Sequence, residues 1–525
     1  MASPFIPIDR NCPIELPASL EGWLREDHLA RFIVDVVEQL DLSAIEQVYS
    51  GRGSPAYPPK LMVALLFYGY ATGVFFSRKL EQASYESVPF IYIAGGRHPD
   101  HDSINSFRKR FLVQLEDLFV QILLIAHRLG VLKLGDIFID GSKVEANASK
   151  HKAMSWDYAN QLEARLKAEV EKLLELAETA HGQEHRGLNI PAELARREER
   201  LKKIAEAKAE IERRARERYE RERGEYEEKM ARRAAQEKQT GKKPGGRAPK
   251  APTPGPQGKD QVNFTDEESR IMPVSGGGFE QAYNGQIGVE GDSRLIVCQH
   301  LSQQPNDKQE LVPALDKLAQ LPEELGQVKT ASADTGYYSE DNVIACAKAD
   351  VVPYIACGRE PHYPPLAERL VGAPQAPENP DPVSALRHRL KTAEGKAHYA
   401  KRKSTVEPVF GIIKHVIGFR HFRLRGLKAV QGEWTLVCIA FNLKRLHTLK
   451  GVKKAAEVAA SMLLSGLRLA MWCLYPTIGS LGLGEKHVPC ESPTDSYSGS
   501  HTDHIQNPTC LKKPLASLGE RVCKA

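Results

Sequence analysis

A highly charged segment, residues 152 to about 260, constrains the fold more than any other part of this 525-residue sequence. Its apolar side chains recur at alternating intervals of three and four, over 162–177 and again over 194–219, and charged residues of both signs fill the other positions. This spacing predicts two amphipathic helices. The break at 181–191 contains two glycines and a proline, so we expect an antiparallel coiled-coil hairpin over 152–238.

The stretch after the hairpin has a different composition. Residues 239–268 open with a run rich in glycine, proline and lysine, which cannot bury apolar surface and therefore predicts a mobile basic linker. The favoured interpretation of this run is a solvated linker, and the alternative is that its basic residues contact phosphate. Its basic residues are Lys242, Lys243, Arg247 and Lys250.

Short strand-like runs flank the hairpin on both sides. Residues 136–140 predict one strand within 131–151, and 281–290 with 294–300 predict an antiparallel pair. Farther on, predicted helices over 310–321 and 340–348 alternate with two more strand-like runs. This order predicts an α/β fold: a mixed sheet with helices on its faces, formed by 131–151 and 269–450, with the hairpin inserted after the first strand.

Two acidic residues stand where predicted strands end. Asp140 closes the run of apolar residues at 137–139, and Asp334 closes a second strand shortly before Ser339, a candidate cap for the following helix. Both acids also have a structural interpretation, because each precedes residues that are typical of turns. Glu145 is a substitute candidate that ranks below them.

A third acidic residue, Glu407, lies much later in the chain. Carboxylates on separate elements suit the binding of Mg²⁺, which prefers oxygen ligands. The structural alternative is a capping box with Ser404, three residues earlier. Pro408 weakens that alternative, since with Thr405 as the cap the proline would fall in the first turn of a helix, where no hydrogen bond is lost.

Residues 1–130 predict a compact helical domain. A helix that follows Pro58-Pro59 is apolar enough to be buried on most sides. A second helix, with Asp102 or Ser103 as its cap, carries three consecutive basic residues. A DNA-reading helix and a solvated helix end explain this basic run equally well. The three residues are Arg108, Lys109 and Arg110.

Composition excludes several classes of protein. The formal charge is only +5, so any affinity for nucleic acid must come from local basic patches. The nine cysteines form no Cys-x-x-Cys pair and the sequence does not begin like a signal peptide, which favours a cytoplasmic protein. The apolar stretch 458–483 contains Arg468 and Pro476, so we expect no membrane span.

The C-terminal segment 451–525 resembles none of the preceding parts. From about residue 485 it is rich in serine, threonine, proline and histidine, a composition that predicts disorder. Its histidines and cysteines fit no closed zinc pattern.

Several motifs in the right order resemble the DDE transposases of bacterial insertion sequences. They are FIDGSKVEANASK around Asp140, ASADTGYYS around Asp334 and STVEPVFGIIKH around Glu407, with YPPKLMVALLFYGY and HPDHDSINSFRKRF in the N-terminal region. The resemblance covers roughly residues 15 to 450. It implies a ribonuclease-H-like catalytic domain behind an all-α N-terminal DNA-binding domain.

The resemblance also implies a site and partners. Asp140, Asp334 and Glu407 would be the catalytic residues and would hold two Mg²⁺ ions, or Mn²⁺ in their place, with Asp140 bridging them. The partner would be double-stranded DNA, both terminal inverted repeats and target, bound by a homodimer in the bacterial nucleoid. The implied DNA contacts are Tyr399, Arg402, Lys403, Lys414, Arg108, Lys109 and Arg110.

The chain departs from the family pattern on one side of Glu407. The spacing to Lys414 is kept, and this places the lysine two helical turns on and nearly on the same face. Lys403 stands four residues before Glu407, where the family has arginine, and Tyr399 stands eight residues before it, one more than the pattern. The roles of Tyr399, Arg402 and Lys403 are therefore open.

Three functions follow from these features. The first is a transposase that binds the ends of its insertion sequence, cleaves them and joins the 3′ ends to target DNA. The second is a catalytically inactive, transposase-derived DNA-binding protein, and the third is a coiled-coil interaction protein that acts through 155–235. DNA that carries the element's ends would be cut by the first with Mg²⁺, bound by the second and ignored by the third.

Overall fold

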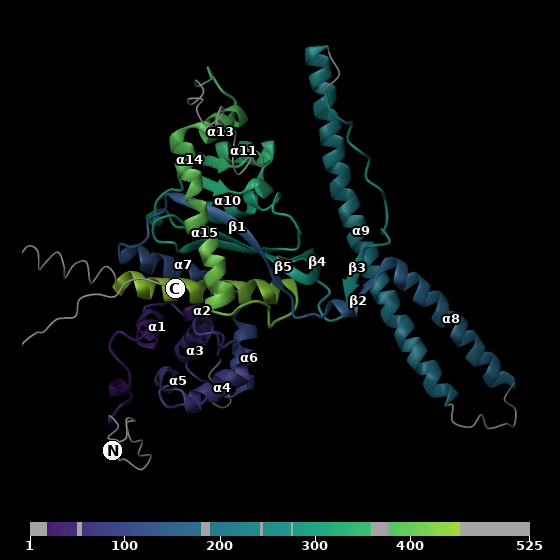
Figure 1. Ribbon diagram of the computed structural model, residues 1–525. Coiled ribbons are helices and arrows are strands. Elements are labelled where there is room, and N and C mark those ends of the chain that lie inside the picture. Colours follow the sequence, from purple (N-terminus) through teal and green to yellow (C-terminus); the bar gives the residue numbers. More distant parts are fainter. Residues whose placement is uncertain are drawn as a thin grey trace, which may run out of the picture. The chain divides into compact units, whose positions relative to one another are not determined.

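The computed structural model shows one compact unit, Met1–Glu457, that contains all the residues described here (Figure 1). The structure describes 18–49, 55–179, 189–241, 245–274, 277–358, 375 and 377–451. The tail predicted to be disordered, most of the hairpin break, and Lys242 and Lys243 of the predicted linker lie outside the described residues.

The N-terminal part is helical, as predicted. Helix α3 is buried along nearly its whole length, because its side chains are apolar on every face. Helix α6 begins two or three residues earlier than predicted. Asp100, in extended conformation, accepts a hydrogen bond from the Ser103 amide at 2.8 Å, so Asp100 is the cap and Asp102 and Ser103 are not. The helices are η1 (Leu20–Trp23), α1 (Leu29–Glu38), α2 (Ser43–Glu46), α3 (Pro59–Ala71), α4 (Ser77–Glu86), α5 (Val88–Ile93), α6 (His101–Arg110) and α7 (Gln114–Arg128).

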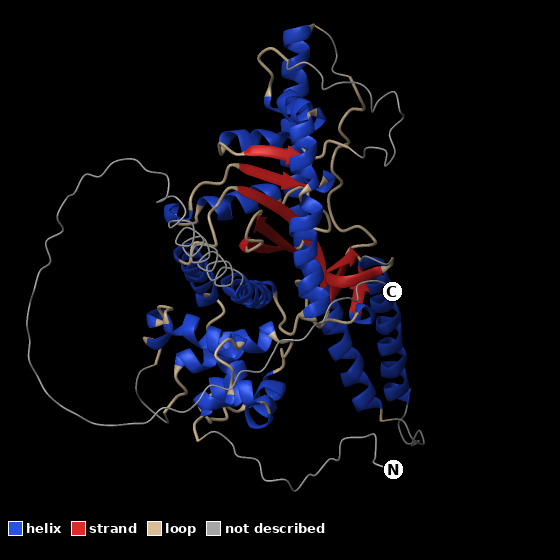
Figure 2. Ribbon diagram, turned by 60° about the vertical axis from the view of Figure 1, so that its left-hand side comes forward, coloured by secondary structure: helices blue, strands red, loops and turns tan. Residues whose placement is uncertain are grey.

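A mixed sheet follows, which confirms the predicted α/β class and is consistent with a ribonuclease-H-like domain (Figure 2). Its order is β4-β5-β1-β7-β8, with β6 also paired to β5. Strand β1 is antiparallel to β5 and parallel to β7, so it lies in the interior of the sheet. The strands are β1 (Asp136–Glu145), β4 (Arg270–Pro273), β5 (Phe279–Glu290), β6 (Ile296–Ser302), β7 (Thr330–Ala333) and β8 (Val352–Ile355).

Helices cover the sheet, and two of them matter most for the site. Helices α14 and α15 run almost end to end across the strands, and α15 packs on β1 and β5 (Figures 1 and 2). A further helix over 427–451 buries Trp434 completely. The other elements are η3 (Glu323–Leu325), η4 (Thr335–Tyr337), α10 (Leu311–Ala319), α11 (Glu340–Lys348), α13 (Pro382–Lys391), α14 (Ala393–Ala400), α15 (Arg402–Gly411) and the π-helix η5 (Ile412–Val416).

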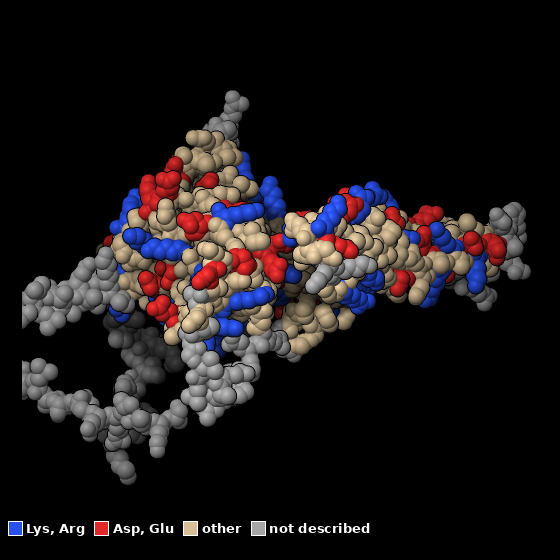
Figure 3. Space-filling model, turned by 90° about the horizontal axis from the view of Figure 1, so that it is seen from above, with Lys and Arg blue, Asp and Glu red and all other residues tan. Residues whose placement is uncertain are grey.

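The insertion after β1 is the predicted helical hairpin, α8 (Trp156–Thr179) against α9 (Ile190–Thr240). Leu162, Leu166 and Ile204 are buried between the arms, as their spacing predicted, and Ile211 is buried in a separate cluster with Val262. Ion pairs join the arms or follow one helix, and Figure 3 shows acidic and basic side chains interspersed on the face it presents. The hairpin surface on that face therefore has no single-sign stripe.

A small sheet closes the base of the hairpin and was not predicted. Strand β2 (Ala153–Ser155), just after the 3-10 helix η2 (Lys150–Lys152), pairs with β3 (Gln261–Asn263) in antiparallel register. The predicted linker over 239–268 is thus wrong for its last part, which is ordered by pairing with a strand about a hundred residues earlier in the chain. Local composition carries no sign of such a distant partner.

Candidate active site

Asp140 does not lie at a strand tip, which corrects the sequence-based expectation. Strand β1 continues to Glu145 because β5 pairs with it throughout. The parallel neighbour β7 is shorter, however, and its pairing with β1 ends at Phe138 and Ser332. Two residues farther along both strands come Asp140 and Asp334, so the two acids emerge where the parallel strands part.

Asp334 also has the local role that was its structural alternative. Its Oδ1 accepts a hydrogen bond from the Gly336 amide at 2.8 Å and caps the 3-10 helix η4. The chain then turns into α11, which Ser339 caps through the Asn342 amide at 3.1 Å, as predicted. A turn role and a place in the acidic cluster are therefore compatible for Asp334.

Arg402 joins the other two acids. Its Nη2 lies 2.9 Å from Glu407 Oε1 and its Nη1 lies 3.4 Å from Asp140 Oδ2. The Asp140 side chain is 18% exposed, whereas that of Glu407 is 45% exposed. Carboxylates from β1 and α15 thus share one cation, although they are 267 positions apart in the sequence.

Burial is the main influence on Asp140. It raises the pKa of this carboxyl from 3.8 to about 6, and the negative charges of Asp334 and Asp307 act in the same direction. Arg402 and the Gly141 amide, which donates to Asp140 Oδ1 at 2.9 Å, act against the rise. A cation that approached Asp140 would therefore relieve the cost of a buried charge.

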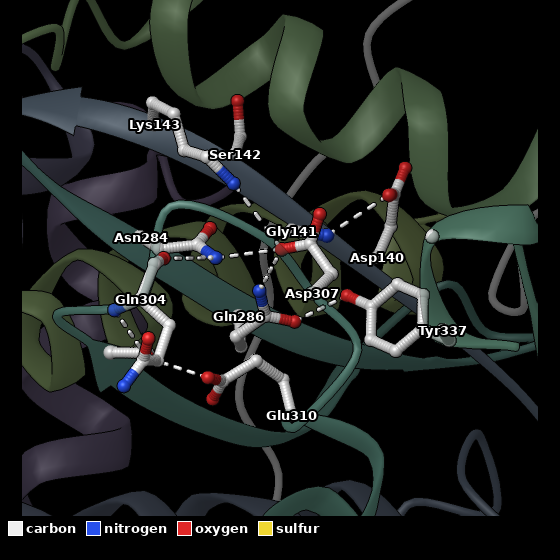
Figure 4. Close-up of polar contacts among 12 residues, drawn as sticks. Asp140, Gly141, Ser142, Lys143, Asn284, Gln286, Gln304, Asp307, Glu310 and Tyr337 are labelled. Carbon is white, nitrogen blue, oxygen red and sulfur yellow. Dashed lines mark hydrogen bonds and ion pairs between the residues drawn. The ribbon is translucent and has the colours of Figure 1, made fainter. Parts of the chain in front are cut away.

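A fourth carboxylate, Asp307, belongs to the same neighbourhood and was missed from the sequence (Figure 4). Its Oδ1 accepts from Asn284 Nδ2 at 2.6 Å and Gln286 Nε2 at 2.7 Å, and it pairs with Lys143 Nζ at 3.3 Å. The only local signal was an acid ahead of a predicted helix, and a capping residue would look the same.

Gln286 connects this network to the turn after β7. Its side-chain oxygen accepts from the Tyr337 hydroxyl, while its amide nitrogen donates to Asp307 (Figure 4). A side chain at position 141 would collide with this arrangement, because a Cβ built on Gly141 lies 2.2 Å from Gln286 Nε2. Glycine beside Asp140 therefore fits the close approach of the Gln286 and Asp307 side chains, whose ends would have to shift to admit a methyl group.

The other residues predicted to contact DNA near the site differ in their burial and their hydrogen-bond partners. Tyr399 is half-buried beside Arg402, and burial raises the pKa of its phenol. Lys414 Nζ donates to Ser142 Oγ at 2.5 Å and to the Lys143 carbonyl at 2.9 Å, and burial lowers its pKa. Lys403 is exposed on α15.

Lys414 thus lies against β1, past Asp140, and no contact joins it to Glu407. The prediction assumed a regular α-helix from Glu407 to Lys414, but the helix changes to π geometry at Ile412. The wider π turn alters the face on which Lys414 emerges. Glu145, the substitute candidate, lies at the far end of β1 and bridges to His421, away from the other acids.

Neither sequence-based interpretation of the residues before Glu407 is right. Helix α15 begins at Arg402, so Ser404 and Thr405 lie inside it, and both hydroxyls donate to the Lys401 carbonyl, at 3.0 and 2.9 Å. Hence Ser404 forms no capping box, Thr405 is no cap, and Pro408 lies in the helix interior. The preceding helix α14 runs almost directly into α15, so α15 begins without a side-chain cap, which the local capping rules did not predict.

The three consecutive basic residues on α6 also differ in their exposure to solvent. Arg108 is buried, and its Nη1 donates to the Tyr70 hydroxyl at 3.1 Å and the Phe75 carbonyl at 2.9 Å. Lys109 and Arg110 are exposed. Only these two are presented to solvent, because the helix turns Arg108 toward α3.

The donor set fits a hard divalent cation, although the described residues contain no group of three or more His, Cys, Asp or Glu side chains close enough to hold one. All three predicted ligands are carboxylates, the ligand type that Mg²⁺ and Mn²⁺ prefer. The guanidinium of Arg402 lies between two of them, which indicates that they attract a shared positive charge.

Two protein families match parts of the chain. Residues 18–110 match a family described as a transposase domain (DUF772), and residues 375–447 match one described as a transposase DDE domain. No curated protein and no solved structure matches the chain. Within the described ranges, no helix is long and apolar enough to cross a membrane.

Proposed function

We propose that this chain, two parts of which match transposase domain families, is a DDE transposase of an insertion sequence that binds the ends of its element, cleaves them and joins the 3′ ends to target DNA. The observation that carries this proposal is the meeting of Asp140 and Glu407 on one guanidinium, with Asp334 on the adjacent strand end. An unrelated fold would have little reason to bring these acids together.

Asp140, Asp334 and Glu407 would hold the divalent ions, Mg²⁺ or Mn²⁺. Two such ions stabilise the attacking and leaving oxygens of an in-line phosphoryl transfer. Arg402 would then give up its place between Asp140 and Glu407, and the half-exposed Glu407 has the freedom to turn. A displaced guanidinium remains next to the site, where it can pair with a DNA phosphate.

Other residues would hold the DNA. Tyr399 lies on the helix before α15, Lys403 on α15 itself, and Lys414 on the π-helix that follows it. A cation or hydroxyl there can contact the backbone beside the cleaved bond. Lys109 and Arg110 on α6 are exposed and remain candidates for end binding. A homodimer would bring two element ends together, in the bacterial nucleoid.

The test uses the full-length protein and duplex DNA that carries the element's terminal inverted repeats. Asp140→Ala, Asp334→Ala and Glu407→Ala should each abolish Mg²⁺-dependent cleavage while end binding is largely retained. Lys203→Ala on the hairpin is the control and should cut normally. Binding without cleavage by the unmodified protein would support the catalytically inactive alternative, and cutting by any of the three acid variants would remove that residue from the site.

A further inference from the structure

A second polar cleft lies apart from the carboxylates, between the start of α4 and the segment 421–423. Its volume is about 320 Å³. None of its lining residues is acidic, and three of them are arginines; burial and the neighbouring Arg423 lower the pKa of the fourth basic residue, His421. The lining residues are Phe76, Ser77, Arg78, Arg108, Asn147, His421 and Arg423.

Two donors in this cleft lack a partner. The Nε atoms of Arg108 and Arg423 are buried, and neither makes a hydrogen bond within the described structure. Buried donors without acceptors are rare because each one costs about 1–3 kcal/mol. Both atoms belong to residues that line the same cleft, so two unsatisfied donors lie in its wall.

The surroundings of the cleft also favour a bound anion. No side chain caps the start of α4, so its first-turn amides and the positive end of the helix dipole meet no acidic group there. The Arg423 guanidinium lies over the Phe76 ring, 4.1 Å from its centroid. Burial lowers the pKa of Arg423 and Arg108 adds to this effect, while Glu433 opposes it. The two guanidiniums therefore repel each other, and the charge of Glu433 opposes the effect of this repulsion on Arg423.

Glu433 is the nearest carboxylate, and it is already engaged. It accepts the Tyr70 hydroxyl at 2.8 Å and the backbone amides of Arg423 and Leu424, both at 2.9 Å. It is fully buried and does not line the cleft. Glu433 fixes the position of the 423–424 backbone, but it leaves the Nε atoms unpaired.

The cleft connects to the carboxylates through β1. The segment that carries His421 pairs with the end of β1, since the Glu145 amide donates to the Arg420 carbonyl and Glu145 accepts from Phe422. Five residues of extended chain separate Asp140 from Glu145, which is about 16 Å. That distance corresponds to roughly five nucleotides of rise along one DNA strand.

We propose that this cleft binds a backbone phosphate of the DNA strand whose cleaved bond lies at Asp140. The inference rests on the proposed function and adds a DNA-binding site to it. Arginine forks recognise phosphate with two parallel hydrogen bonds, and Arg78, which is exposed, can complete the contact. A neighbouring cleft shares Asn147 and His421 and adds Lys152 and Arg425, together with one acidic residue, Glu145; its two basic side chains extend the surface for the next phosphates.

The experiment measures affinity for a short fluorescent duplex over a series of KCl concentrations. Arg78→Gln should reduce the slope of log affinity against log salt by about 0.9, the loss of one phosphate contact. Arg423→Gln should do the same, and Arg423→Lys should restore part of the affinity because it keeps the charge without the fork. Arg128→Gln on α7 is the matched control, exposed and outside the cleft, and its slope should be unchanged.

Melting curves of each variant show whether it is folded. If Arg423→Gln does not fold, Arg78→Gln decides, since its side chain lies at the surface. The proposal would be overturned if a folded Arg78→Gln protein gave the same slope as the unmodified protein. It would also be overturned if inorganic phosphate bound in the cleft without competing with the duplex. Binding without Mg²⁺-dependent cleavage by the unmodified protein would instead contradict the proposed function and would leave these slopes as they are.

Discussion

Replacement of Asp140 by asparagine should stabilise the metal-free protein while it abolishes cleavage. A carboxyl pKa that rises from 3.8 to about 6 on folding corresponds to about 3 kcal/mol of destabilisation once the group is ionised. Below 3.8 the group is protonated in both states and no penalty exists. As the pH rises from 3.8 to about 6 the unfolded chain ionises first, so the folded state loses stability, and above 6 the loss is complete.

Asparagine removes the charge and keeps nearly the same shape. Its amide oxygen can still accept from Gly141, and Arg402 keeps Glu407 as its partner. The rise in the pKa of Asp140 already includes the opposing attraction of Arg402, so we expect a gain in unfolding free energy of about 2–3 kcal/mol at neutral pH and almost none at the acid end of the window.

Urea unfolding with a chelator present, followed by circular dichroism, measures the effect. Asp334→Asn is the matched control: it removes the same charge from the same cluster, but from a partly exposed side chain, so its gain should be smaller. An Asp140→Asn protein that is no more stable than the unmodified one at neutral pH would refute the reasoning. So would a gain that stays the same across the acid range.

Three further outcomes are expected. Gly141→Ala should destabilise by about 1–3 kcal/mol in urea unfolding and slow cleavage, because its new methyl group meets the Gln286 amide; an unchanged cleavage rate would contradict the close approach. Glu433→Ala should cost about 3 kcal/mol of unfolding free energy, since the Tyr70 hydroxyl and two backbone amides lose their acceptor, and a loss below 1 kcal/mol would show that water replaces it. Ser339→Ala should cost about 1 kcal/mol through the lost helix cap, and equal urea midpoints would show that the cap contributes nothing.

Local patterns in the sequence were enough for the individual elements. The intervals of three and four predicted both arms of the hairpin, and Ser339 predicted the start of α11 at the correct residue. These features depend on residues within a few positions of each other, so a single sequence contains all the information they need. The three acids were singled out for a related reason, because their neighbours form recognisable motifs.

Tertiary structure decided what those acids touch. Pairing with β5 carried β1 past Asp140, and the π-helix at Ile412 turned Lys414 toward β1. Arg402, whose role the motif left open, became the residue that joins Asp140 to Glu407. Such contacts depend on strand register and helix phase between residues that are hundreds of positions apart. The residues next to each of them in the sequence therefore do not determine these contacts.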